Sequence, residues 1–242
     1  MSTAQSNTTP RAAARRDARR AASNRIPTKT AATSPTSWSS RTEFAMTVTI
    51  AAVAIGAIAA LVVTGTMGQF LAWAWQRHAN VMSWYVRPLF ILPLALFSYR
   101  RSPSGIALTL LALATSMFWF PAPAVVDPKI AQFLAFEREW LTSGWTPGKV
   151  MQTMLVPALL TALCWAFWKR SLVLGLIIIN AMALGKMAWG VIEGDGTGWA
   201  MQLPAIVGLA ICNGFVLYAH RKVRSRTAQA EVTVNGGRTV RL

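Results

Sequence analysis

Residues 47–63 read TVTIAAVAIGAIAALVV and contain no charged side chain. A helix that crosses the hydrocarbon core of a bilayer needs about 20 apolar residues, and we expect the span around this stretch to cover residues 45–68. Five similar runs follow along the chain. The expected spans after the first are 82–99, 105–125, 150–168, 171–192 and 200–219. The sequence therefore predicts an all-α fold, a polytopic membrane bundle of six transmembrane helices.

The composition supports a membrane protein. The chain has 242 residues, of which 54% are hydrophobic and 13% charged, whereas soluble domains carry about 25% charged residues. A net charge of +16 can indicate a nucleic-acid-binding protein. Here the basic residues gather in the tails and in short gaps between apolar runs, which is typical of membrane topology. The expected partner is the lipid bilayer and not nucleic acid.

Two basic tails flank the expected transmembrane domain, which covers residues 43–220. Residues 1–42 have almost no large apolar side chain, so they are predicted to be disordered, and 221–242 form a second basic tail. Such tails are attracted to anionic lipid headgroups by about 1 kcal/mol per charge. An Arg- and Ser-rich, acid-poor leader is also typical of a cleaved organelle transit peptide.

The basic residues alternate from gap to gap. Most of them lie in the two tails and in the 99–104 and 169–170 gaps, while the intervening gaps hold Arg77, Lys129, Arg138 and Lys149. The positive-inside rule then places both termini in the cytoplasm. The expected location is a bacterial inner membrane, with an organelle membrane as the alternative.

The gap at 126–149 contains a predicted helix. Asp127-Pro128 is a helix start signal, and the predicted element covers residues 128–142. At 100° per residue one broad face is apolar. That face consists of Ile130, Phe133, Leu134, Phe136, Trp140 and Leu141. We expect an amphipathic helix lying on the outer membrane surface.

Three charged residues are the first candidates for a ligand-binding site. Arg87 and Lys186 lie inside predicted spans, about five or six residues from their outer ends, and Glu137 lies in the middle of the apolar helix face. Charges within a membrane are costly and often functional, although long side chains can also reach back to the headgroups. We expect Arg87, Lys186 and Glu137 to cluster, with Glu193 and Asp195 above them. The alternative is a structural ion pair that holds the surface helix to the bundle.

Asn180, near mid-membrane, is a further candidate site residue, although an interhelical hydrogen bond is its more ordinary role. Asn213 in the last span can act in the same way.

The Gly-rich turn at 193–199 follows a helix, which argues against a nucleotide loop. No HExxH, GxSxG or Walker motif is present, Cys164 and Cys212 form no Cys/His cluster, and the two histidines, His78 and His220, are isolated. No catalytic residue, metal or cofactor is therefore expected, and an enzyme is less favoured than a non-catalytic protein.

Two functions remain open. The first is a small transporter or permease-like protein for a small polar or anionic solute, which predicts a polar cavity from Arg87 and Lys186 towards Asn180. The second is an accessory or assembly subunit that uses its aromatic-rich outer face to bind another membrane protein or a second copy of the chain.

Overall fold

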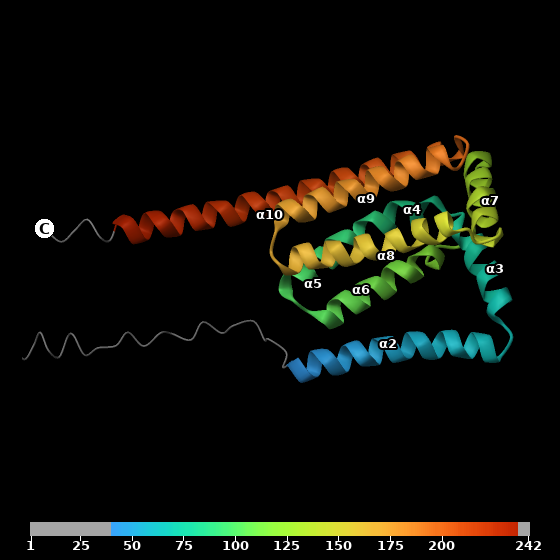
Figure 1. Ribbon diagram of the computed structural model, residues 1–242, viewed down its shortest axis with the longest axis horizontal. Coiled ribbons are helices and arrows are strands. Elements are labelled where there is room, and N and C mark those ends of the chain that lie inside the picture. Colours follow the sequence, from blue (N-terminus) through green and yellow to red (C-terminus); the bar gives the residue numbers. More distant parts are fainter. Residues whose placement is uncertain (1–39, 237–242) are drawn as a thin grey trace, which may run out of the picture. The chain divides into compact units, whose positions relative to one another are not determined.

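The computed structural model describes residues 40–236, with only some of the side chains beyond residue 222. All regular secondary structure in this part is helical (Figure 1). The elements are α2 (Ser40–Val63), α3 (Met67–His78), α4 (Val81–Leu89), α5 (Ile91–Arg100), α6 (Pro103–Thr115), η1 (Ser116–Phe118), α7 (Pro128–Thr142), α8 (Pro147–Trp168), α9 (Leu172–Ile192), η2 (Thr197–Met201) and α10 (Gln202–Gly236).

Five helical segments are long and apolar enough to cross a membrane, which is compatible with an integral membrane protein. They are Ser40–Val63, Val81–Arg100, Pro147–Trp168, Leu172–Ile192 and Thr197–Lys222. Apolar side chains on their outer surfaces are widely exposed, such as Ile55, Val156 and Phe215. Such a surface suits hydrocarbon better than water, because soluble monomers rarely expose continuous apolar areas of this extent.

The predicted span at 105–125 is too long. The helix ends at Thr115, one 3₁₀ turn continues to Phe118, and residues 119–127 are not helical. Pro121 and Pro123 lie in this segment, and proline cannot donate the backbone hydrogen bond that helix continuation requires. Pro103–Phe118 is therefore a shorter apolar helix than the other five.

Two further boundaries differ from the prediction. Helix α3 occupies a stretch expected to be largely a gap, and it is a short helix with Ala74 and His78 buried. Helix α10 continues beyond residue 220 to Gly236, because no Pro or Gly interrupts residues 215–235. The predicted basic tail at 221–242 is thus helical up to Gly236. Of the predicted tail at 1–42, only 40–42 are described, within α2.

The second apolar run is broken near its prolines. The helix is interrupted at Phe90, two residues after Pro88, and α5 then continues to Arg100. The Pro88 carbonyl accepts a hydrogen bond from the Cys212 thiol of α10 at 3.4 Å. A neighbouring helix therefore satisfies a backbone group at the break, as is common in membrane bundles.

Contacts between connecting segments define two ends of the bundle (Figure 1). At one end, the Glu43 carboxylate accepts hydrogen bonds from Ser102 and Ser104 at the start of α6, and Arg101 Nε donates to the Trp168 carbonyl at 3.3 Å. We call this the Glu43 end. At the other end, α7 packs against η2, and Arg77 donates to the Phe120 carbonyl at 3.3 Å. We call this the α7 end.

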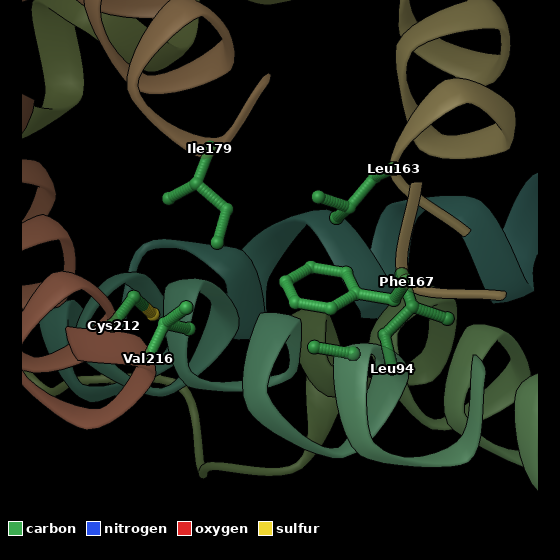
Figure 2. Close-up of a cluster of buried hydrophobic side chains, with 7 residues drawn as sticks. Leu94, Leu163, Phe167, Ile179, Cys212 and Val216 are labelled. Atoms are coloured by element: carbon green, nitrogen blue, oxygen red, sulfur yellow. The ribbon is translucent and has the colours of Figure 1, made fainter. Parts of the chain in front are cut away.

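The main hydrophobic core lies between α5, α8, α9 and α10 (Figure 2). Its buried residues are Leu94, Ala95, Leu163, Phe167, Ile179, Cys212 and Val216. Two glycines allow close approach here. Phe167 packs directly on Gly175, and Pro88 packs directly on Gly208, so that a Cβ at either glycine would overlap the facing ring. This core joins α5, α8, α9 and α10, and the Pro88–Gly208 contact joins α4 to α10.

Candidate functional site

Helix α7 covers the ends of neighbouring helices. It has the predicted bounds, because Asp127 caps it by accepting a hydrogen bond from the Lys129 N–H at 2.8 Å and Pro128 occupies the first turn. Ile130, Phe133 and Leu134 are buried in a second core with Ala79 and Trp84. The Phe133 and Trp84 rings lie 5.7 Å apart. Protein therefore covers this part of the apolar face, and the packing directs Glu137 towards the bundle.

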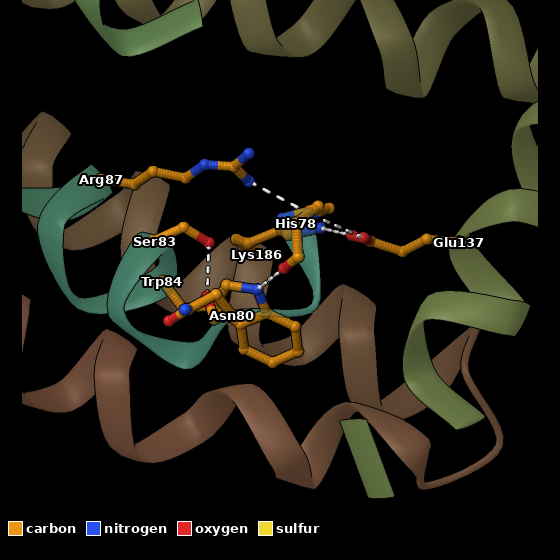
Figure 3. A network of polar contacts seen from close by, with 7 residues as sticks. All are labelled: His78, Asn80, Ser83, Trp84, Arg87, Glu137 and Lys186. Atoms are coloured by element: carbon orange, nitrogen blue, oxygen red, sulfur yellow. Dashed lines mark hydrogen bonds and ion pairs between the residues drawn. The ribbon is translucent and has the colours of Figure 1, made fainter. Parts of the chain in front are cut away.

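Glu137 is the centre of a polar network of residues from four helices (Figure 3). Its Oε1 accepts a hydrogen bond from Lys186 Nζ of α9 at 3.0 Å, and its Oε2 lies 3.6 Å from His78 Nε2 of α3. The Glu137 side chain is 18% exposed, whereas that of Lys186 is 46% exposed. The expected contact between Glu137 and Lys186 is therefore present, and His78 is a member that the sequence did not indicate.

His78 is held in place by its neighbours. Its carbonyl accepts a hydrogen bond from Trp84 Nε1 at 2.9 Å, and its side chain is only 7% exposed. Burial lowers the pKa of His78, and although Glu137 acts against this, Arg87 and Lys186 add to the lowering. The imidazole is therefore neutral at pH 7.

Glu137 is ionised under the same conditions. Burial by itself raises the pKa of Glu137, but the contact with His78 and the charge and hydrogen bond of Lys186 outweigh it, and the net pKa is lowered. A carboxylate with little exposure needs such partners, because desolvation of an unpaired charge is costly.

Arg87 is the third basic group of the network. Its Nη1 lies 3.4 Å from His78 Nε2, the same ring nitrogen that faces Glu137. A neutral imidazole nitrogen can either donate or accept, so it cannot satisfy both neighbours at once. Among the side chains that the structure describes, no carboxylate forms an ion pair with Arg87. With His78 neutral, Arg87 and Lys186 outweigh Glu137, and the network has one excess positive charge.

A cavity of about 360 Å³ begins at this network. The charged or imidazole side chains in its lining are those of His78, Arg87, Glu137 and Lys186. The rest of its wall is apolar and comes mainly from α4, α9 and α10. Representative wall residues are Pro88, Ile91, Ile179, Met182, Leu209 and Cys212. The volume lies within the range of small-molecule pockets, roughly 300–1,000 Å³.

The other three predicted site residues do not line this cavity. Asn180 and Asn213 exchange two side-chain hydrogen bonds, at 2.9 and 3.1 Å, which link α9 to α10. Glu193 accepts a hydrogen bond from Gln152 at 3.3 Å. Asp195 lies in the following turn with a left-handed backbone, φ 47°. Of the expected set, the structure brings together Arg87, Lys186 and Glu137.

The chemistry of the network favours binding of an anion. In the described part of the chain, no group of three His, Cys, Asp or Glu side chains is placed to hold a metal ion. A guanidinium and an ammonium group instead offer several N–H donors to one oxyanion, and Arg is well suited to carboxylate or phosphate groups.

No family model, curated protein or solved structure matches this chain.

Proposed function

We propose that the protein is a permease-like membrane protein that receives an anionic solute in the cavity beneath α7. The observation that carries the proposal is the position of Arg87. This guanidinium lines the cavity and has no carboxylate partner among the described side chains. An anion that enters the cavity would neutralise the excess positive charge. It would also give Arg87 an acceptor other than His78 Nε2, the ring nitrogen that Glu137 contacts as well.

The proposal includes a six-span topology with both termini in the cytoplasm. Its support is the charge distribution, since Arg100, Arg101, Lys169 and Arg170 all belong to the connections at the Glu43 end. The shortest segment, Pro103–Phe118, rises about 24 Å at roughly 1.5 Å per residue, against a hydrocarbon core of about 30 Å. A modest local thinning of the bilayer accommodates that difference. The same charge bias suits a bacterial inner membrane, with an organelle membrane as the alternative.

One observation favours the second candidate function, an accessory subunit. The cavity walls are apolar and Asn180 is engaged with Asn213, so among the described residues no continuous polar route leads inward from Arg87. A protein that binds a ligand or a membrane partner without transporting it requires no such route. Transport and binding therefore have to be measured separately.

Butyrate is a suitable probe for the first test. We expect the full chain, reconstituted in phosphatidylcholine nanodiscs, to bind butyrate in equilibrium dialysis beyond the level of empty nanodiscs. Arg87→Gln should weaken this binding at least tenfold, because a hydrogen bond to a charged group contributes about 1.5–3 kcal/mol. Arg138→Gln is the matched control, since Arg138 is exposed on α7 and does not line the cavity.

If Arg87→Gln and Arg138→Gln lost butyrate binding equally, the loss would reflect only a general effect of surface charge and would contradict a site at Arg87. Butyrate uptake into proteoliposomes that also depends on Arg87 supports the permease function. Arg87-dependent binding without uptake would overturn it in favour of the accessory function.

A further inference from the structure

We infer that the ligand of this cavity is a single-chain amphiphilic anion, with its anionic head at Arg87 and Lys186 and its apolar tail between α4, α9 and α10. This inference rests on the proposed function, since it specifies the class of anion that the same site receives. It also explains why a charged network opens onto an otherwise apolar wall.

The lining residues change from charged to apolar along each helix. On α9, Lys186 is followed towards mid-helix by Met182 and Ile179, which places the apolar wall about 10 Å deep at roughly 1.5 Å per residue. Arg87 of α4 is followed by Pro88 of the same helix and by Ile91 at the start of α5. A small polar anion would bind at the charged end and leave this depth empty, whereas an apolar tail would fill it.

The volume sets the scale of the ligand. At about 360 Å³ the cavity lies towards the lower end of the range for small-molecule pockets, roughly 300–1,000 Å³. A small anionic head with one medium-length alkyl chain belongs to this size class. A two-chain phospholipid is far larger, so the site suits a medium-chain fatty acid or a single-chain alkyl phosphate.

The surroundings of the cavity also suit an amphiphile. Val156 of α8 lines the cavity and is 59% exposed, so the protein does not seal the apolar lining at α8. The Lys186 side chain is 46% exposed at the charged end. A ligand dissolved in the bilayer can therefore approach with its tail in hydrocarbon and its head near the headgroup level.

The test compares decanoate, butyrate and decanol with the full chain in phosphatidylcholine nanodiscs at pH 8.5, with empty nanodiscs subtracted. Each methylene transferred from water into an apolar site contributes about fourfold in affinity. Decanoate should therefore bind at least a hundredfold more tightly than butyrate. Decanol, which has the same chain and no charge, should bind at least tenfold more weakly than decanoate.

The outcomes separate the two proposals. Equal affinity for butyrate and decanoate would overturn the amphiphile inference and leave the anion site intact. Equal affinity for decanol and decanoate, or no binding of any of the three, would overturn both.

A cavity-filling variant locates the tail. Ala183 lines the cavity, while the neighbouring Leu184 is 57% exposed and does not. Ala183→Phe should reduce decanoate affinity at least tenfold more than butyrate affinity, and retained butyrate binding also shows that the variant is folded. Leu184→Phe is the control and should change neither. Unchanged decanoate binding by Ala183→Phe would place the tail outside the cavity and contradict the inference.

Discussion

Glu137 is the residue on which the polar network depends, since it is the carboxylate that lies 3.0 Å from Lys186 and 3.6 Å from His78. Its role as a structural ion pair and its role beside a ligand site make different predictions. A structural role predicts lost stability on substitution. A role beside an anion site predicts that substitution strengthens anion binding, because removal of a negative charge leaves the site more positive.

We expect Glu137→Gln to destabilise the protein by about 1–3 kcal/mol, since the substitution removes the carboxylate that opposes the positive charges of Arg87 and Lys186 in the network. Lys186 contributes the smaller share because it is nearly half exposed and solvent screens it. The measurement is the thermal unfolding midpoint in nanodiscs, with the exposed Glu139→Gln as the control. Unchanged stability together with altered butyrate affinity would assign Glu137 to the site alone.

The network also predicts loss of stability on acidification. His78 has a pKa below its usual value of 6.5 and Glu137 a pKa below its usual 4.5. In both cases the unfolded chain binds protons more readily than the folded chain, so stability falls as pH decreases. The loss begins near pH 6.5 through His78 and continues below pH 4.5 through Glu137.

Protonated His78 would face Arg87 of α4 and Lys186 of α9, with Glu137 of α7 as the opposing charge. We expect His78→Gln to remove the upper part of the pH dependence, measured as the unfolding midpoint between pH 8 and 5. His220→Gln, in the middle of α10 and outside the cavity lining, is the control. A midpoint that stays constant between pH 8 and 5 in the unmodified protein would contradict the prediction.

At the scale of single elements, local signals determine how well the sequence predicts the structure. Helix α7 could be predicted to the residue because Asp127 and Pro128 are local start signals. The length of α6 could not, because the apolar composition of 105–125 continues past the point where Pro121 and Pro123 prevent a helix. Helix α3 has no comparable start signal, since its N-cap residue Thr66 makes no side-chain capping bond.

In the candidate site, too, some residues could be predicted from local sequence signals and others could not. Arg87, Lys186 and Glu137 could be identified because a charge within an apolar run or face is conspicuous along the sequence. His78 was missed because its partner Glu137 lies in another helix, and only the packing of α3 against α4 and α7 brings them together. The sequence predicted Glu193 and Asp195 above the charged cluster, but Glu193 instead accepts a hydrogen bond from Gln152 of α8.

The contact between α4 and α10 gives an element-scale prediction. A Cβ at Gly208 would overlap the Pro88 ring, whereas nothing lies within 4 Å of a Cβ at Gly214 on the same helix. Gly208→Ala should therefore cost about 1–3 kcal/mol, as overpacking usually does. Gly214→Ala should be neutral or slightly stabilising, because Ala favours a helix by up to about 1 kcal/mol over Gly.

Both variants are compared by thermal unfolding in nanodiscs. Because Pro88 and Gly208 both line the cavity, Gly208→Ala should also weaken decanoate binding, and Gly214→Ala should not. Equal stability of the two variants would show that α4 and α10 are not in the close contact described above.

At the scale of the whole molecule, the two ends of the bundle differ in charge and in chemistry. The Glu43 end carries the basic connections between α5 and α6 and between α8 and α9, whereas the α7 end carries the ion-pair network and the opening of the cavity. If basic connections face the cytoplasm, a ligand reaches Arg87 from the outer side. The orientation in the membrane therefore decides which side supplies the ligand.

Three single cysteines test this orientation and the number of spans. Ser40, Ser143 and Ser225 are exposed at the start of α2, after α7 and on α10. With six spans, three crossings separate Ser40 from Ser143, and three more separate Ser143 from Ser225. A membrane-impermeant maleimide should then label Ser143→Cys in intact bacterial cells, and Ser40→Cys and Ser225→Cys only after lysis. The unsubstituted chain is the control, because Cys164 and Cys212 lie within apolar helices.

The pattern of labelling also decides whether the short helix α6 crosses the membrane. If Pro103–Phe118 does not cross, only two crossings separate Ser40 from Ser143, and these two positions would be labelled together, opposite Ser225. If Ser143→Cys and Ser225→Cys were labelled on the same side, α8, α9 and α10 would not be three successive spans. In that case Arg87 and Lys186 would lose their place near the membrane boundary, and the bilayer could no longer supply an amphiphilic anion to the cavity in the way proposed.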